Sequence, residues 1–204
     1  MAHLCAGLFL VQAARGLAQP PASVPAPAAV LVEFRGSGVE VSRQPGVWDP
    51  ARTNQTLFGG NLLRTDAHSQ ALLRFSDLET VRVAERSSLR IAEPVREKRG
   101  LEFLKGLLYF FHRDKPNEFE VRTPQMSAII RGTEFTLEVA QDGTSTLSLL
   151  AGEAALSNPL GQIELKTGEQ GIAAPGQAPR RTAMLEAANL IQWCLNSCRS
   201  STAG

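Results

Sequence analysis

The sequence predicts an all-β protein, arranged as a short-strand two-sheet sandwich or a solenoid-like β-roll, with one C-terminal helix. Three observations predict this class. Between Val30 and about Ile172, apolar and polar residues alternate with the period of two that is typical of half-buried strands. Turn residues interrupt the alternation at short intervals. The helical period is absent from the whole stretch.

The expected strands follow one another along this region. In segment 134–139, Phe135, Leu137 and Val139 share one face, as in a strand half-buried against a second sheet. Segment 106–111 is more continuously apolar, which predicts a more fully buried strand. Because no strand can bury its apolar face alone, the strands are expected to stack. The expected strands are 30–34, 38–42, 71–75, 80–83, 89–91, 106–111, 118–121, 128–130, 134–139, 146–149, 154–156 and 162–165.

The N-terminal segment indicates export. Residues 4–11 form an apolar run shorter than the roughly 20 residues that span a bilayer, and no Lys or Arg precedes it. Small residues follow at Gly16 and Ala18, as a signal peptidase requires. We therefore interpret residues 1–18 as a signal peptide cleaved near Ala18, and the Pro- and Ala-rich residues 19–29 as a stalk. The expected location is periplasmic or secreted.

Helical periodicity appears only in residues 175–204, which we interpret as a linker and an amphipathic helix. Thr182 is a candidate cap, and Met184, Ala188, Ile191 and Leu195 recur on one face. Such a helix either packs back on the sheets or packs on further helices. The second alternative is favoured, with the segment as the truncated start of a helical-repeat region.

Composition excludes several classes of protein. The chain has 204 residues, of which 43% are hydrophobic and 20% are charged, so it can form a core and is not wholly disordered. Its formal net charge is +1, which supplies no global field for nucleic acid, and none is expected as a partner.

No catalytic, cofactor-binding or metal-binding residues are expected. His3, His68 and His112 are scattered without metal-ligand spacing, and His68 is expected in a solvated turn. Cys194 and Cys198 are poorly spaced for a disulfide within one helix, and we expect free or intermolecular thiols. Neither a nucleophile elbow nor a phosphate-binding loop motif is present.

Two arginine-containing motifs admit a functional and a structural interpretation. Arg122 and Arg131 could form an anion site. The favoured alternative is structural: Pro124 ends an edge strand, and Gly132 allows a backbone conformation or a close approach that a side chain would forbid.

A carbohydrate-binding domain is a further alternative. Trp48 and Phe58, in an expected loop spanning residues 44–60, are the candidate stacking platform. Glu134 and Glu138 share one strand face and are interpreted as polar-face carboxylates, because a glycosidase needs an opposed pair.

Several blocks between residues 30 and 174 resemble the FecR domain, a periplasmic module known from iron–siderophore signalling. The most specific are 119–124 and 128–135, which are similar to the family's F-x-V-x-T-P and G-T-x-F core. Weaker matches lie at 60–65, 69–77, 104–110, 149–154 and 165–170. The motif positions, with expected structural roles, are Gly60, Thr65, Ser69, Asp77, Gly106, Thr123, Pro124, Gly132, Thr133, Phe135, Gly152 and Gly168.

The resemblance implies a function but not all of the family's activity. FecR-type regulators carry a cytoplasmic segment that handles a sigma factor and then a transmembrane helix, and the apparent signal peptide replaces both here. We therefore expect a non-enzymatic, exported binding or scaffolding module of the cell envelope that holds a protein or an envelope polymer. The alternative is a periplasmic sensor that signals to an extracytoplasmic-function sigma factor, which requires residues 4–11 as an uncleaved anchor.

Overall fold

A computed structural model describes residues 26–76, 79–93, 99–113 and 118–183. All regular secondary structure in these ranges is β-strand, so the all-β prediction is confirmed. No helix within them has the length and apolarity that crossing a bilayer requires. The strands are β1 (Pro27–Arg35), β2 (Val39–Gln44), β3 (Val47–Pro50), β4 (Gln55–Phe58), β5 (Leu62–Thr65), β6 (Gln70–Arg74), β7 (Glu79–Val83), β8 (Ser88–Ile91), β9 (Arg99–His112), β10 (Phe119–Arg122), β11 (Ser127–Val139), β12 (Ser145–Asn158), β13 (Gly161–Lys166), β14 (Glu169–Ala173) and β15 (Arg180–Ala183).

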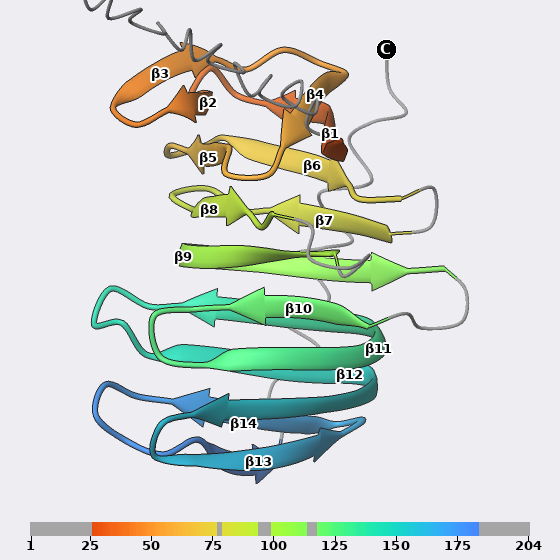
Figure 1. Ribbon diagram of the computed structural model, residues 1–204, viewed down its shortest axis with the longest axis vertical. Helices are drawn as coiled ribbons and strands as arrows, with labels where there is room; N and C mark the ends of the chain where they lie inside the picture. Colours follow the sequence, from red (N-terminus) through yellow and green to blue (C-terminus); the bar gives the residue numbers. More distant parts are fainter. Residues whose placement is uncertain (1–25, 77–78, 94–98, 114–117, 184–204) are drawn as a thin grey trace, which may run out of the picture.

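The strands form one continuous hydrogen-bonded sheet that is folded into two layers facing each other, and the strands follow one another along the long axis of the molecule (Figure 1). The first layer runs β4-β1-β6-β7, then the C-terminal halves of β9 and β11, the N-terminal half of β12, β14 and β15. The second layer runs β3-β2-β5-β8, then the N-terminal half of β9, β10, the N-terminal half of β11, the C-terminal half of β12, and β13. The sandwich and the roll expected from the sequence are therefore two aspects of one fold.

Three long strands cross from one layer to the other. β9 pairs with β8 and β10 up to Lys105 and with β7 and β11 beyond it. β11 and β12 change partners in the same way, and their shared ladder is irregular between Gly132 and Phe135. The segments expected as separate strands, 128–130 with 134–139 and 146–149 with 154–156, are thus the two halves of single bent strands.

Glycines occupy the corners where these strands bend. Gly152 has a φ of +115°, and a Cβ there would collide with the Cα of Gly132, its partner across the ladder. A Cβ on Gly132 would lie 2.6 Å from the Ala151 carbonyl oxygen. At Gly106, with a φ of +101°, a Cβ would collide with the Ser87 side chain. The corners are compact because no side chain separates the crossing backbones, as expected at Gly132.

The core fills the space between the layers and centres on four aromatic rings. Phe110 stacks on Phe135 with centroids 4.7 Å apart and interplanar angle 17°, and it contacts Phe119 at 4.7 Å. Phe119 in turn meets the edge of Phe75 at 5.2 Å. Leu, Ile and Val side chains occupy most of the remaining core. The rings come from both layers, so this cluster joins the two sheets.

Some local expectations are wrong. The run 106–111 is not buried throughout: Leu108 and Phe110 are buried, but Phe111 is 38% exposed, because this half of β9 has one face on the core and one on the outside of the first layer. Residues 44–60 are not one loop, because they contain β3 and β4. Pro124 does not end an edge strand, since β10 lies between β9 and β11.

The described residues include only parts of the two terminal segments. β1 begins at Pro27, within the segment interpreted as a stalk. Thr182, the candidate helix cap, lies in β15. The signal peptide (1–18), the helix body from Met184 onward with both C-terminal cysteines, and Asp77 lie outside the described residues.

Candidate functional site

The described motif residues occupy corners, turns and the core, and they do not converge on one site. Gly132, Thr133 and Gly152 meet at the corner shared by β11 and β12. Gly60 and Gly168 have φ values of +84° and +83° in turns. Phe135 is a fully buried member of the ring cluster, and Gly106 bends β9. These positions lie where backbone conformation or core packing restricts the side chain.

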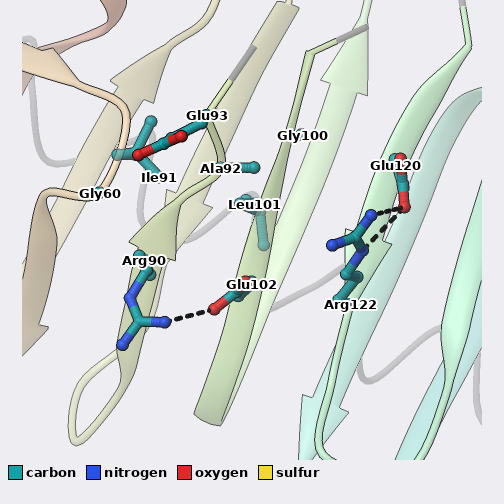
Figure 2. Close-up of a pocket in the computed structure, with 10 residues that line it drawn as sticks. All are labelled: Gly60, Arg90, Ile91, Ala92, Glu93, Gly100, Leu101, Glu102, Glu120 and Arg122. Carbon is teal, nitrogen blue, oxygen red and sulfur yellow. Dashed lines mark hydrogen bonds and ion pairs between the residues drawn. The ribbon is translucent and has the colours of Figure 1, made fainter. Parts of the chain in front are cut away.

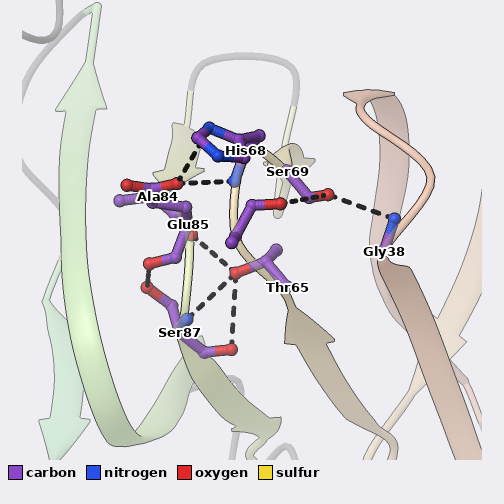
Figure 3. Close-up of polar contacts among 8 residues, drawn as sticks. Gly38, Thr65, His68, Ser69, Ala84, Glu85 and Ser87 are labelled. Atoms are coloured by element: carbon purple, nitrogen blue, oxygen red, sulfur yellow. Dashed lines mark hydrogen bonds and ion pairs between the residues drawn. The ribbon is translucent and has the colours of Figure 1, made fainter.

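Thr65 is the centre of a buried polar network at the C-terminal end of β5 in the second layer (Figure 3). Its hydroxyl donates to the carbonyl oxygen of Ala84 at 2.6 Å. The same hydroxyl accepts the backbone N–H of Ser87 at 3.0 Å. The Ser87 hydroxyl accepts the N–H of Leu107, beside the bend of β9, so the network connects the turn after β5 to that corner.

Ser69 and His68 connect the same turn to its neighbours (Figure 3). The buried Ser69 hydroxyl accepts the Gly38 N–H at 3.1 Å, which ties the loop before β2 to the loop before β6. The His68 N–H donates to the Glu85 carboxylate at 2.5 Å. The imidazole of His68 itself is 95% exposed, as expected for a solvated turn residue.

Replacing Thr65 with Val tests this network. The change keeps the shape of the side chain but leaves the Ser87 N–H without its hydroxyl acceptor. We therefore expect the free energy of unfolding to fall by about 1–3 kcal/mol. Denaturant titration with an unchanged m-value is the measurement. The matched control is Thr80→Val on β7, whose hydroxyl makes one long, exposed contact of 3.5 Å and whose loss should cost less than about 0.5 kcal/mol. Equal effects at the two positions would contradict the role of Thr65.

Thr123 closes the turn that follows β10. Its hydroxyl accepts the backbone N–H of Met126 at 3.1 Å and the Ser145 hydroxyl at 2.8 Å. Pro124 lies inside this turn, which leads into β11. The T-P pair is therefore a turn element between two interior strands.

The outer face of the second layer is lined with ion pairs. Arg122 pairs with Glu120 at 2.8 Å, and Arg131 pairs with Glu118 at 2.5 Å. The two guanidinium groups are therefore each engaged by a carboxylate, which does not fit the alternative of a shared anion site. Further pairs on this face are Arg90–Glu102 at 2.9 Å and Arg64–Glu40 at 2.5 Å.

A groove of about 350 Å³ lies in this charged face, over β8, β9 and β10 (Figure 2). Gly100 lines it, and a Cβ there would collide with the Glu120 carbonyl oxygen. The Arg90–Glu102 pair and the Glu120–Arg122 pair flank it with both signs of charge. Arg90, Glu102 and Arg122 are consecutive partners across the three strands. The groove could not be predicted from the sequence, because only the pairing of β8, β9 and β10 brings its lining residues together.

The structure does not assemble the carbohydrate platform. Trp48 is on β3 in the second layer, and Phe58 is on β4 in the first. The Arg64 guanidinium lies 4.2 Å from the centre of the Trp48 ring, so that face of the indole is already occupied by a cation–π contact. Glu134 accepts the Tyr109 hydroxyl at 2.6 Å, while Glu138 is exposed further along the same strand.

Metal ligands do not cluster in the part of the chain that the structure describes. Across residues 26–76, 79–93, 99–113 and 118–183, no three His, Cys, Asp or Glu side chains come together as a cation site requires.

Similarity to solved structures places the fold. Two crystal structures of a proposed anti-sigma factor from Parabacteroides distasonis ATCC 8503, at 1.65 and 2.50 Å resolution, each superpose with a TM-score of 0.55 at 20% sequence identity. Each match covers 65% of this chain and 64% or 63% of the other, so this chain spans less than two thirds of their length. At this identity the likeness establishes a shared fold. No curated protein sequence matches the chain significantly.

Similarity to a family model identifies the domain. The model described as FecR protein matches residues 61–155, from the end of the β4–β5 turn to the C-terminal half of β12. The matched range contains the Thr65 network, the lining of the groove over β8–β10 except Gly60, and the three corner glycines. The resemblance found in the sequence is confirmed: residues 61–155 of this chain match the FecR family model.

Proposed function

We propose that this chain is an exported, non-catalytic regulator in a signalling system, and that it acts by binding a protein partner. The match to the FecR family over residues 61–155 carries this proposal. The shared fold with a proposed anti-sigma factor supports a regulatory role over an inert scaffold. Of the two carboxylates weighed as candidate acids, Glu134 accepts the Tyr109 hydroxyl and Glu138 is exposed further along the same strand, which supports binding rather than bond chemistry.

The charged face of the second layer is the partner-binding surface in this proposal. Its ion pairs are half-exposed, so a partner can contact both the carboxylates and the guanidinium groups, which are held on neighbouring strands of the sheet. The groove over β8–β10 has a volume of about 350 Å³, and the charged side chains that line it can pair with partner side chains of either charge. Such complementarity favours selectivity for one partner.

A swap of one ion pair tests the regulatory role. In the host cell, deletion of the gene should change the transcripts of a defined set of genes, and the wild-type chain should restore them. The doubly substituted chain with Glu120→Arg and Arg122→Glu keeps an internal ion pair but reverses the charges beside the groove. We expect it to melt like the wild type and to fail to restore the transcripts.

The control is the swap Glu40→Arg with Arg64→Glu, at the far end of the same face, which should restore them. Transcripts that do not respond to the deletion would contradict the regulatory role. Export is checked separately, because mass spectrometry of the mature protein should find its first residue near Gln19.

A further inference from the structure

The two outer faces of the sandwich differ in character. The second layer carries the ion pairs described above together with the exposed Leu104 and Ile129. The first layer instead presents apolar side chains along β6, β9 and β14, all partly buried except the more exposed Phe111: Leu72, Leu107, Tyr109, Phe111 and Ile172. Apolar side chains gathered on one outer face indicate a surface that packs against another element.

Burial at the centre of this face supports the same conclusion. Phe135 and Leu137 point into the core, so Thr136 between them points outward, yet it is only 2% exposed. Its ladder partner Ser148 is 1% exposed and also lies between two core residues. Among the residues that the structure describes, β11 and β12 contact chiefly their neighbours in the sheet. The Ser148 hydroxyl accepts the side-chain amide of Gln170 on β14 at 2.9 Å, and no described strand lies over Thr136.

The chain leaves the sheet beside this face. β15 is at the edge of the first layer and ends at Ala183, three strands from Thr136 in the order β15-β14-β12-β11. Three strand spacings amount to about 14 Å. A helix that rises about 1.5 Å per residue covers that distance in about ten residues. Segment 184–195 is long enough, and its sequence predicts an apolar stripe of Met184, Ala188, Ile191 and Leu195.

We propose that segment 184–204 docks as an amphipathic helix on the outer face of the first layer, over Thr136 and Ser148. The small side chains there allow the helix to approach the sheet closely, and the surrounding Leu107, Tyr109 and Ile172 receive its apolar stripe. The sequence analysis favoured packing on further helices. The burial of Thr136 and Ser148, which lie in one row across the sheet with Gln170 of β14 and Thr182 of β15, supports packing back on the sheets instead. This inference does not depend on the regulatory role.

A double-mutant cycle in the full chain tests the docking. Cys194 and Cys198 report on the segment, since a docked helix shields their thiols from a maleimide reagent, and Cys5→Ser removes the third thiol from every variant. Thr136→Arg places a long charged side chain on the face, and Ile191→Asp places a charge in the stripe. We expect either change to raise the rate of thiol labelling by about tenfold or more, as local protection is lost. The double variant should label no faster than the faster single variant.

The matched control is Ala155→Arg, which puts the same side chain on the outward side of the second layer and should leave labelling slow. If Thr136→Arg fails to fold, Leu107→Asp on the rim of the face replaces it with the same expected rates. Wild-type thiols that label as fast as in denaturant would overturn the proposal, as would strictly additive effects in the cycle. Protection lost on dilution would assign the face to a second copy of the chain and would equally overturn it.

Discussion

Replacing Gly152 with Ala is expected to destabilise the protein by about 3 kcal/mol or more. Two costs add: a backbone φ of +115° that side chains rarely adopt, worth about 1–3 kcal/mol, and a collision with the Gly132 backbone, worth about 1–3 kcal/mol. The collision cannot be relieved by a rotamer change, because the atoms in contact belong to the backbone of β11. The free energy of unfolding from denaturant titration is the measurement.

Gly168→Ala is the matched control. Gly168 also has a positive φ, +83°, but nothing lies within 4 Å of a Cβ placed there. It should therefore show only the conformational cost of about 1–2 kcal/mol. If the two variants lost the same stability, contact between the crossing strands would not be the reason for glycine at the corner.

Phe110→Ala is expected to cost about 3–5 kcal/mol, the range for removing a large aromatic side chain from a core. Phe110 is the central ring of the cluster, between Phe119 of β10 and Phe135 of β11, so its loss removes contacts between the two layers. Thermal or denaturant unfolding measures the change. Leu104→Ala, on the same strand with its side chain 37% exposed, should cost much less, about 1 kcal/mol. A small loss for Phe110→Ala would show that the layers do not depend on the ring cluster.

The strands themselves could be predicted because their signal is local. The alternation Phe135, Leu137, Val139 is visible in the sequence, and all three side chains are buried in the structure. The strands that escaped prediction are short or flanked by turn residues: β3, β4 and β5 lie within or directly after a segment rich in Gly, Pro and Asn, and β14 and β15 follow similar turns. For these strands, pairing with a distant neighbour rather than local pattern decides the conformation.

The corners and the groove could not be predicted, because both depend on contacts between distant residues. Gly132 stood out in the sequence, but its position opposite Gly152 requires the full β11–β12 ladder. The ion pair between Arg131 and Glu118 joins residues on either side of a turn, and the pair of Arg90 with Glu102 joins two strands across the 94–98 segment. Nothing in the local sequence around an Arg identifies which acid will face it.

The backbone of β9, β11 and β12 continues through both layers, and this limits how the molecule can deform. Sliding one layer past the other would require the ladders on both sides of each corner to break at once. We therefore expect the two layers to move together as one unit, because three strands are shared between them. A partner bound to the outer face of one layer would then keep a fixed distance and orientation relative to a group bound to the outer face of the other layer.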